Sequence, residues 1–442
     1  MASAVPWCER DRRYEQHEPV RDAGGAPMNA RTLTKRPLRA ARQTGLSLIE
    51  LMVALVVSMV IVGAVFGLMS VSEGRKRTTM SVSDINQSGV FALYQLDKAI
   101  RSAGSGYSQN WPLTYGCHLN VNLNGDQILP SPTKVPPPFD KLSGQLGGFR
   151  LTPLLIVQNG SPLTTGSSDV LITMAGNAGY GEIPTEFSNT APTISGSVVN
   201  LSLINTMTFN AGNLVLMADR NNAQGNVQPC YVGQVQTGFT GNVAVQLPLA
   251  GAYDASVGKD GNAASVSATG VAMNLGNVGG GNLPAFGVYG VGANNTLMFY
   301  DLLQSGGNGY TAIPLTDGVV EMHALYGIDP NNTGNVSWQA PTGAFDAATL
   351  SNGTQTAAAN LYAIKAVRIG LILRTSLPER AQQYVTSASA TTATGVVSPG
   401  PLVLFADVPG LAYTRKLAGA EQNYRYRVLE ATIPLRNTLL QR

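Results

Sequence analysis

The sequence predicts an α+β protein in which one long N-terminal α-helix is followed by a large, β-rich globular head. Three observations support this prediction. An uncharged apolar run extends from Leu51 to Ser72, an apolar stripe with helical spacing continues to about residue 103, and short apolar runs separated by Gly, Asn, Pro and Ser fill the rest. At 442 residues the chain has room for two or three domains or for one elaborated domain.

Charge is unevenly distributed along the chain. Residues 1–45 hold nine of the 29 Lys and Arg residues and five of the 26 Asp and Glu residues, which leaves 20 bases and 21 acids. This nearly neutral remainder argues against broad electrostatic binding of nucleic acid. Charged residues make up only 12% of the chain, which is typical of a loop-rich protein outside the cytoplasm.

The apolar run from Leu51 to Ser72 is long enough to cross a bilayer, since its 22 residues form a helix of roughly 33 Å. The segment before it carries five bases and no acid between Met28 and Gly45. The positive-inside rule therefore places this leader in the cytoplasm and the remainder of the chain outside. Met28 is a second candidate for the translation start.

The polar-to-apolar switch has a specific order of residues, Thr44-Gly45-Leu46-Ser47-Leu48-Ile49-Glu50. This stretch resembles the prepilin-peptidase site of type IV pilins and type II secretion pseudopilins. The resemblance implies that a membrane peptidase removes residues 1–45 by cutting after Gly45, and that the new N-terminus at Leu46 is methylated. Phe is commonest at that position in the family, so Leu46 departs from the pattern. A plain signal anchor is the alternative.

Glu50 is an acid at the start of an apolar helix, where an unpaired charge is costly. The resemblance implies that Glu50 accepts the new amine of a neighbouring subunit and so sets the register of assembly. An unpartnered Glu near the lipid headgroups is the alternative. Farther along the helix, Gly63 and Gly67 form a small-x-x-x-small pair that permits close helix packing.

The helix is predicted to continue past the membrane, so that residues 46–103 form one element. Its second half has an apolar stripe at spacings of three and four, formed by Val82, Ile85, Gly89, Leu93, Leu96 and Ile100. Ala103-Gly104-Ser105-Gly106 predicts the end of the helix, since Gly is the usual C-terminal cap. We expect the stripe to lie on a sheet.

Residues 104–442 are predicted to form the head. Strands are predicted at 154–158, 169–174, 197–203, 214–218, 243–247, 296–302, 319–326, 366–374 and 425–433, and 287–292 is interpreted as a Gly-rich strand. The segments 250–282 and 376–401 are predicted to be surface insertions, because they are low in apolar content or rich in Ser, Thr and Ala.

Several head segments also resemble one branch of the family, the PilW-type minor pilins. The resemblance rests on 91–104 at the helix end, 213–219, 315–329, 367–374 and the ending Tyr424-Arg425-Tyr426-Arg427-Val428…Leu435-Arg436-Asn437. Residues 104–310 match the family much less.

Cys117 and Cys230 are the two cysteines downstream of the leader, which suits a disulfide in an oxidising compartment. Two separate buried thiols are the alternative interpretation. Cys117 falls later than the Cys that commonly follows the helix in PilW-type proteins.

The sequence carries no catalytic motif, and we expect no enzyme activity. His118 and His323 lie far apart and lack metal-ligand spacing, so His118 is interpreted as a loop residue and His323 as a structural one. We expect no cofactor. The Asp329–Asn335 turn offers oxygen ligands for Ca²⁺, but a plain Asn-Gly turn is favoured.

The resemblance implies a structural subunit that primes assembly of the type IV pilus or sits at its tip. Its expected partners are the prepilin peptidase/methyltransferase, other minor pilins, the major pilin and the bacterial inner membrane. A type II secretion pseudopilin is the alternative within the family. A tip module that binds a surface or DNA is the alternative of another class, and its site would lie in residues 104–310.

Overall fold

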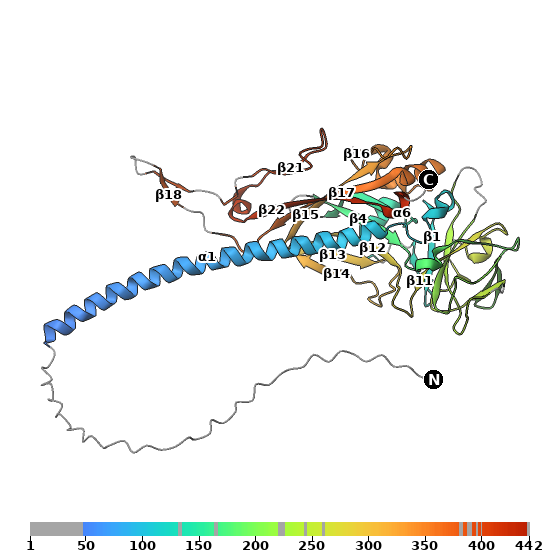
Figure 1. Ribbon diagram of the computed structural model, residues 1–442, viewed down its shortest axis with the longest axis horizontal. Helices are drawn as coiled ribbons and strands as arrows, with labels where there is room; N and C mark the ends of the chain where they lie inside the picture. The colour runs from blue at the N-terminus through green and yellow to red at the C-terminus, as the bar shows by residue number, and fades with distance from the viewer. Residues whose placement is uncertain are drawn as a thin grey trace, which may run out of the picture. The chain divides into compact units, whose positions relative to one another are not determined.

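A computed structural model of the chain describes residues 47–130, 135–162, 167–219, 226–242, 245–258, 261–379, 383–386, 391–394, 397–398 and 400–439 (Figure 1). The chain divides into two compact units, residues 1–68 and 69–442. In the first unit the described residues are almost entirely helical. The second contains the rest of that helix and the β-rich head, so the predicted α+β class is confirmed.

The long helix α1 (Leu48–Ser102) is continuous and contains no proline. Every residue from Leu48 to Arg77 is exposed, and this part of α1 is long and apolar enough to cross a membrane. The buried residues of its second half are Ile85, Gly89, Ala92, Leu96, Ala99 and Ile100. Four of the six residues of the predicted stripe are among them, and the other two, Val82 and Leu93, are half-buried, so the predicted stripe faces the head.

Two antiparallel sheets form the part of the head next to α1 (Figure 1). The five-stranded sheet has the order β14 (Ile313–Asp317), β13 (Thr296–Asp301), β12 (Ala285–Gly292), β4 (Ser167–Ala175) and β3 (Leu154–Pro162). The four-stranded sheet has the order β16 (Ser337–Gln339), β15 (Val319–Ile328), β17 (Ile364–Arg374) and β22 (Tyr426–Pro434). Because β22 pairs with β17 from Ala366 to Arg374, the end of the chain completes this sheet.

Two further sheets lie beyond the C-terminal end of α1, in green and yellow in Figure 1. The six-stranded sheet has the order β2 (Asp126–Leu129), β1 (Leu119–Leu123), β9 (Cys230–Gln234), β8 (Asn213–Ala218), β11 (Val271–Asn277) and β5 (Thr185–Glu186). The three-stranded sheet has the order β10 (Gln246–Leu249), β7 (Val198–Ser202) and β6 (Thr193–Ser195).

Short elements complete the head. The helices are α2 (Trp111–Thr114), α3 (Leu142–Leu146), α4 (Ala347–Leu350), α5 (Gln355–Ala363) and α6 (Arg436–Leu439). Two antiparallel hairpins, β18 (Gln383–Thr386) with β19 (Thr391–Thr394) and β20 (Leu402–Leu404) with β21 (Tyr413–Arg415), lie between β17 and β22 in the sequence.

The six-stranded sheet separates two hydrophobic cores. On β8, Leu214 and Leu216 face the main core, while Val215 and Met217 face a second core that includes Leu201 of the three-stranded sheet. This alternation is the period of two that a strand requires when both of its faces are buried. The six-stranded sheet therefore forms one side of both hydrophobic cores.

The prediction that 250–282 is a surface insertion is wrong for part of that range. Val271–Asn277 is the buried strand β11, which pairs with β8 in the middle of the six-stranded sheet. The register shifts between Asn274 and Gly276, where Gly276 has a φ of 128°. This bulge and the Gly-rich residues after it obscured the strand signal. Within 376–401, the residues that the structure describes include β18 and β19.

Candidate functional site

The first turn of α1 begins immediately after Ser47. The hydroxyl oxygen of Ser47 accepts a hydrogen bond from the Ile49 N–H at 3.3 Å, and its carbonyl accepts from the Glu50 N–H at 3.0 Å. Ser47 therefore acts as the N-cap and Glu50 is the third residue of the helix, where a negative charge suits the helix dipole. Ser-x-x-Glu is also the capping-box pattern.

Glu50 is exposed and begins an exposed apolar surface. Its pairing with a neighbouring subunit involves an amine on another chain, so that pairing stays a prediction. Gly45 and Leu46, the predicted cleavage and methylation residues, lie outside the described residues. A Cβ added at Gly63 or Gly67 would meet no atom within 4 Å, so both positions are open to close approach by another helix.

The second half of α1 lies close to β17 and β22 at Gly89. A Cβ at this position would lie 2.5 Å from Leu429 Cδ1 and 3.0 Å from Leu373 Cδ2. The Arg427 guanidinium also donates to the side-chain oxygen of Asn86. Glycine thus lets the helix approach the sheet to a distance at which even alanine requires the leucines to move.

The end of α1 is held by residues from the other end of the chain. Gly104 has a φ of 80°, as expected for a glycine cap. The Asn437 amide donates to the carbonyls of Ser102 and Ala103, each at 3.0 Å, and so satisfies two of the acceptors that a helix end leaves free.

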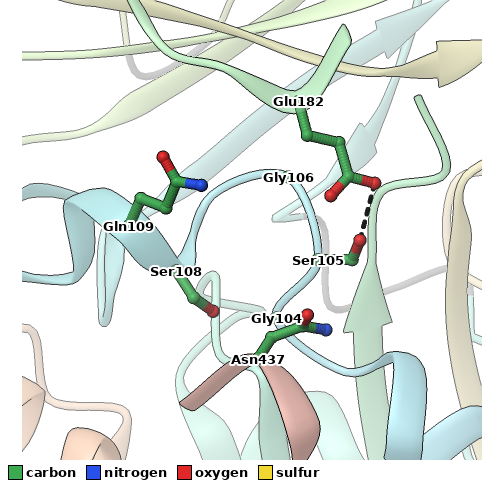
Figure 2. A pocket seen from close by; sticks show the side chains of 7 residues that line it. All are labelled: Gly104, Ser105, Gly106, Ser108, Gln109, Glu182 and Asn437. Atoms are coloured by element: carbon green, nitrogen blue, oxygen red, sulfur yellow. Dashed lines mark hydrogen bonds between the residues drawn. The ribbon is translucent and has the colours of Figure 1, made fainter. Parts of the chain in front are cut away.

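A pocket of about 270 Å³ lies next to the contact between Asn437 and the end of α1 (Figure 2). Figure 2 shows the side chains of Gln109, Glu182 and Asn437 around the loop of Gly104–Gly106. The Ser105 hydroxyl donates to Glu182 Oε1 at 2.6 Å. Ser105 and Glu182 are hydrogen-bonded to each other, and the Asn437 amide is bonded to the carbonyls at the end of α1. We therefore interpret the pocket as part of the structure that fixes the helix end.

Cys117 and Cys230 are joined by a disulfide, and both are fully buried. Cys117 lies two residues before β1, and Cys230 begins β9, the parallel neighbour of β1. The bond links residues 113 apart in the sequence. It therefore ties the strands of the six-stranded sheet to the region directly after α1.

A buried charged cluster lies between β15 and the β20–β21 hairpin. His323 Nδ1 is 3.6 Å from Asp169 Oδ2, and its Nε2 is 3.5 Å from Glu321 Oε2. Arg415 donates to Glu321 and also pairs with Glu421 at 2.6 Å. The cluster holds the hairpin against the sheet.

The two carboxylates determine the protonation of His323. Burial by itself lowers the pKa of the imidazole, but the neighbouring Asp169 and Glu321 outweigh it and raise the pKa to about 9. The Tyr413 hydroxyl donates to Glu321 at 3.0 Å, and its ring lies 3.7 Å from the imidazole centroid. This arrangement is that of a structural ion cluster, as interpreted from the sequence for His323.

The Asp329 turn uses its carboxylate within the loop. Asp329 Oδ1 accepts from the Thr333 N–H at 3.0 Å and Oδ2 accepts from the Gly334 N–H at 2.7 Å. These bonds lower the pKa of Asp329. Among the described residues no group of three or more His, Cys, Asp or Glu side chains could hold a metal ion.

Two family profiles match the chain. The Prokaryotic N-terminal methylation motif matches residues 40–66, which include the Gly45–Glu50 stretch. The profile described as Type IV Pilus-assembly protein W matches residues 288–437, which is 150 of the 442 residues. Residues 288–437 therefore belong to the PilW family, and the two matches together fit a PilW-type minor pilin. The PilW match and the methylation motif fit a structural subunit of the type IV pilus, and the motif together with the long apolar helix fits a membrane-anchored pilin.

The PilW match extends from within β12 to Asn437, the residue that caps α1. It thus covers the four-stranded sheet, which carries the second half of the helix, and excludes the six-stranded and three-stranded sheets. No curated protein and no solved structure matches the chain.

Sequence reasoning missed the cap at Asn437 and the cluster around His323. A signal for the cluster was present, because Glu321 and His323 are polar residues two apart in an otherwise apolar strand and therefore share one face. Asn437 stood in the recognised ending, but its partner carbonyls are 334 and 335 residues away.

Proposed function

We propose that this minor pilin primes assembly of the type IV pilus or occupies its tip. Glu50 carries the proposal, as the exposed third residue of an otherwise apolar and exposed helix start. After cleavage behind Gly45, the amine of Leu46 would lie about one helical turn from Glu50. A carboxylate and an amine that are each costly in an apolar bundle lower each other's cost when they meet between subunits.

In this proposal residues 1–45 are a removed cytoplasmic leader, residues 46–103 are the pilin helix and residues 104–442 are a periplasmic and later extracellular head. The sheets outside the PilW match support a terminal position in the fibre. A subunit of the shaft must repeat its neighbours' contacts at every step, and a head enlarged by two extra sheets makes such repetition difficult.

Cleavage is tested by mass spectrometry of the protein from cells with and without the prepilin peptidase. We expect an N-terminus at methylated Leu46 only when the peptidase is present. A chain that stays uncut in both strains would contradict the proposal.

Assembly is tested by Glu50→Ala, with Glu73→Ala as a control on the same helix beyond the apolar run. Glu50→Ala should leave cleavage intact but abolish incorporation into sheared fibres, whereas Glu73→Ala should be incorporated normally. Normal incorporation of both variants would refute the pairing.

The position in the fibre is tested by immunogold labelling of the head and by counting pili in cells that lack this protein. We expect label at fibre ends and fewer pili. Regular label along the shaft would instead assign the protein to the repeating fibre.

A further inference from the structure

A groove lies where α1 leaves its apolar run, entirely within the second unit. We call it the boundary groove. It has a volume of about 1020 Å³ and is lined by Ser70, Val71, Glu73, Gly74, Arg75, Arg77, Thr78, Thr79, Ser81, Leu377, Pro378, Glu379 and Arg425. The α1 residues lie at and just beyond the end of the uncharged run, and the others come from the segment after β17 and from the residue before β22.

The boundary groove has an excess of positive charge. Its acid Glu379 is held by Arg425, whose Nη2 donates to Oε2 at 3.0 Å. Its other acid, Glu73, lies 3.8 Å from Lys76, which does not line the groove. Within the described part of the chain no ion pair involves Arg75 or Arg77, and both are exposed. Two guanidinium groups therefore remain available to an anion.

The wall opposite α1 presents an apolar side chain, since Leu377 is 57% exposed. The loop that carries it is fixed on both sides. The Thr375 hydroxyl donates to the Leu377 carbonyl at 3.1 Å, and the Glu379 N–H donates to the Asn423 carbonyl at 2.7 Å. These hydrogen bonds fix the backbone on both sides of Leu377, and so keep its side chain exposed.

The two arginines and Leu377 all line the boundary groove, which lies next to the end of the apolar run. The apolar run ends at Ser72, so Ser70 and Val71 lie where a membrane-spanning helix passes from acyl chains to headgroups. A protein surface at this depth of the bilayer contacts the lipid phosphate groups and, on the side of the bilayer centre, the acyl chains. Arginine pairs with phosphate through two parallel hydrogen bonds, and an exposed leucine is stabilised in the acyl boundary.

We propose that the boundary groove binds the headgroup phosphate of an anionic phospholipid, with Arg75 and Arg77 as its cationic ligands and Leu377 inserted beside the acyl chains. The second unit then has a lipid contact in addition to the spanning helix, which fixes how the head stands on the membrane before assembly. The inference rests on the membrane anchor, but not on a priming or tip role.

The test uses the full-length protein in nanodiscs that contain phosphatidylglycerol and phosphatidylcholine, followed by native mass spectrometry of the lipid retained. Arg75→Gln/Arg77→Gln is compared with Lys98→Gln/Lys141→Gln, which removes two exposed charges of the second unit outside the boundary groove. A juxtamembrane basic residue contributes about fivefold in affinity, so we expect roughly 25-fold less retained phosphatidylglycerol for the arginine variant and clearly less change for the lysine variant.

A second measurement follows Leu377→Trp in nanodiscs with brominated phosphatidylglycerol, where quenching beyond that of the wild type is expected. Equal lipid loss in the arginine and lysine variants, or no added quenching at position 377, would overturn the proposal. So would displacement of the lipid by millimolar inorganic phosphate, which would indicate a site for free anions. Co-flotation of each variant with lipid monitors the anchor separately.

Discussion

Charged side chains are buried in the head where β15 meets the β20–β21 hairpin. Asp169, Glu321 and His323 come from two neighbouring sheets, and Arg415 comes from the hairpin. Removing one member of such a cluster leaves an uncompensated buried charge, which is more costly than the pair is stabilising. The cluster thus makes the attachment of the hairpin sensitive to protonation.

The stability of the head should depend on the protonation of His323. The pKa of the imidazole is about 9 in the folded protein, against 6.5 for the ordinary residue. The folded state therefore binds more protons between these values, so the stabilisation is full below pH 6.5 and is lost as the pH rises through 9. The shift corresponds to at most about 3 kcal/mol.

This dependence is measured as the difference in unfolding free energy between the wild type and His323→Gln at a series of pH values. The advantage of the wild type should shrink from pH 6.5 to 9, and groups common to both proteins cancel in the difference. A difference that does not change with pH would contradict the prediction.

Lys365 is a buried lysine whose charge opposes folding. Burial lowers its pKa to about 8 from 10.5, while Nζ donates to the Thr438 carbonyl at 3.0 Å and lies 3.8 Å from the Tyr362 ring centroid. The unfolded state binds more protons between pH 8 and 10.5, so the contribution of Lys365 to stability rises with pH in that window.

Lys365→Met keeps the apolar stem and removes the charge, so we expect a stability within about 1 kcal/mol of the wild type at pH 7, or above it. Denaturant unfolding measures this, with the exposed Lys98→Met on α1 as control. A loss of about 3 kcal/mol or more would show instead that the bond to Thr438 outweighs the cost of burial.

At the scale of elements, the packing of the second half of α1 depends on its close approach to the sheet at Gly89. Gly89→Leu should destabilise the head by about 1–3 kcal/mol, because the new side chain has no space beside Leu373 and Leu429. Gly74→Leu is the matched control, since a Cβ there meets nothing within 4 Å and leucine favours the helix. Thermal unfolding of both variants measures this difference, and equal melting temperatures for Gly89→Leu and Gly74→Leu would contradict the prediction.

The disulfide links the six-stranded sheet to the segment after α1. Cys117→Ala/Cys230→Ala should lower the unfolding free energy by up to about 4–5 kcal/mol in the chain-entropy account of a long loop. Denaturant unfolding with and without reductant checks this, since the reductant should affect the wild type and not the variant. Identical stability of the two proteins would show that the strands hold without the bond.

The strands that the sequence predicts are those with strong local signals. All nine predicted ranges overlap observed strands, and the Gly-rich 287–292 lies within β12. The short β1, β2 and β9 were missed because their residues, such as LNVNL in β1, acquire strand structure from pairing across the sheet. Glu50 was found because a charge stands out in an apolar run, whereas Arg415 and Asn437 act on residues far away in the sequence.

At the scale of the whole molecule, the six-stranded sheet couples the PilW-matched part to the unmatched part, since its two faces belong to different cores. The second unit should therefore unfold in one cooperative transition. Met217→Ala, in the second core, should lower the stability of the entire unit by about 2–5 kcal/mol.

Two probes test this coupling in detergent. Tryptophan fluorescence reports on Trp111, which packs against the main core, and on Trp338, which packs against the core that contains Leu404 and Phe405, while far-UV circular dichroism reports on all strands. Both transitions should shift together in Met217→Ala. Two separate transitions, of which only one moves, would show that the extra sheets form an independent domain.

Asn437 also constrains the order of biogenesis. A ribosome makes α1 more than 330 residues before Asn437, yet the carbonyls at the end of α1 accept hydrogen bonds from that side chain, and β22 must be made before the four-stranded sheet is complete. A chain cut short by a premature stop codon would expose the apolar stripe of its first helix. This exposed apolar surface would make incomplete translation products susceptible to proteolysis before they could enter a growing polymer and terminate it.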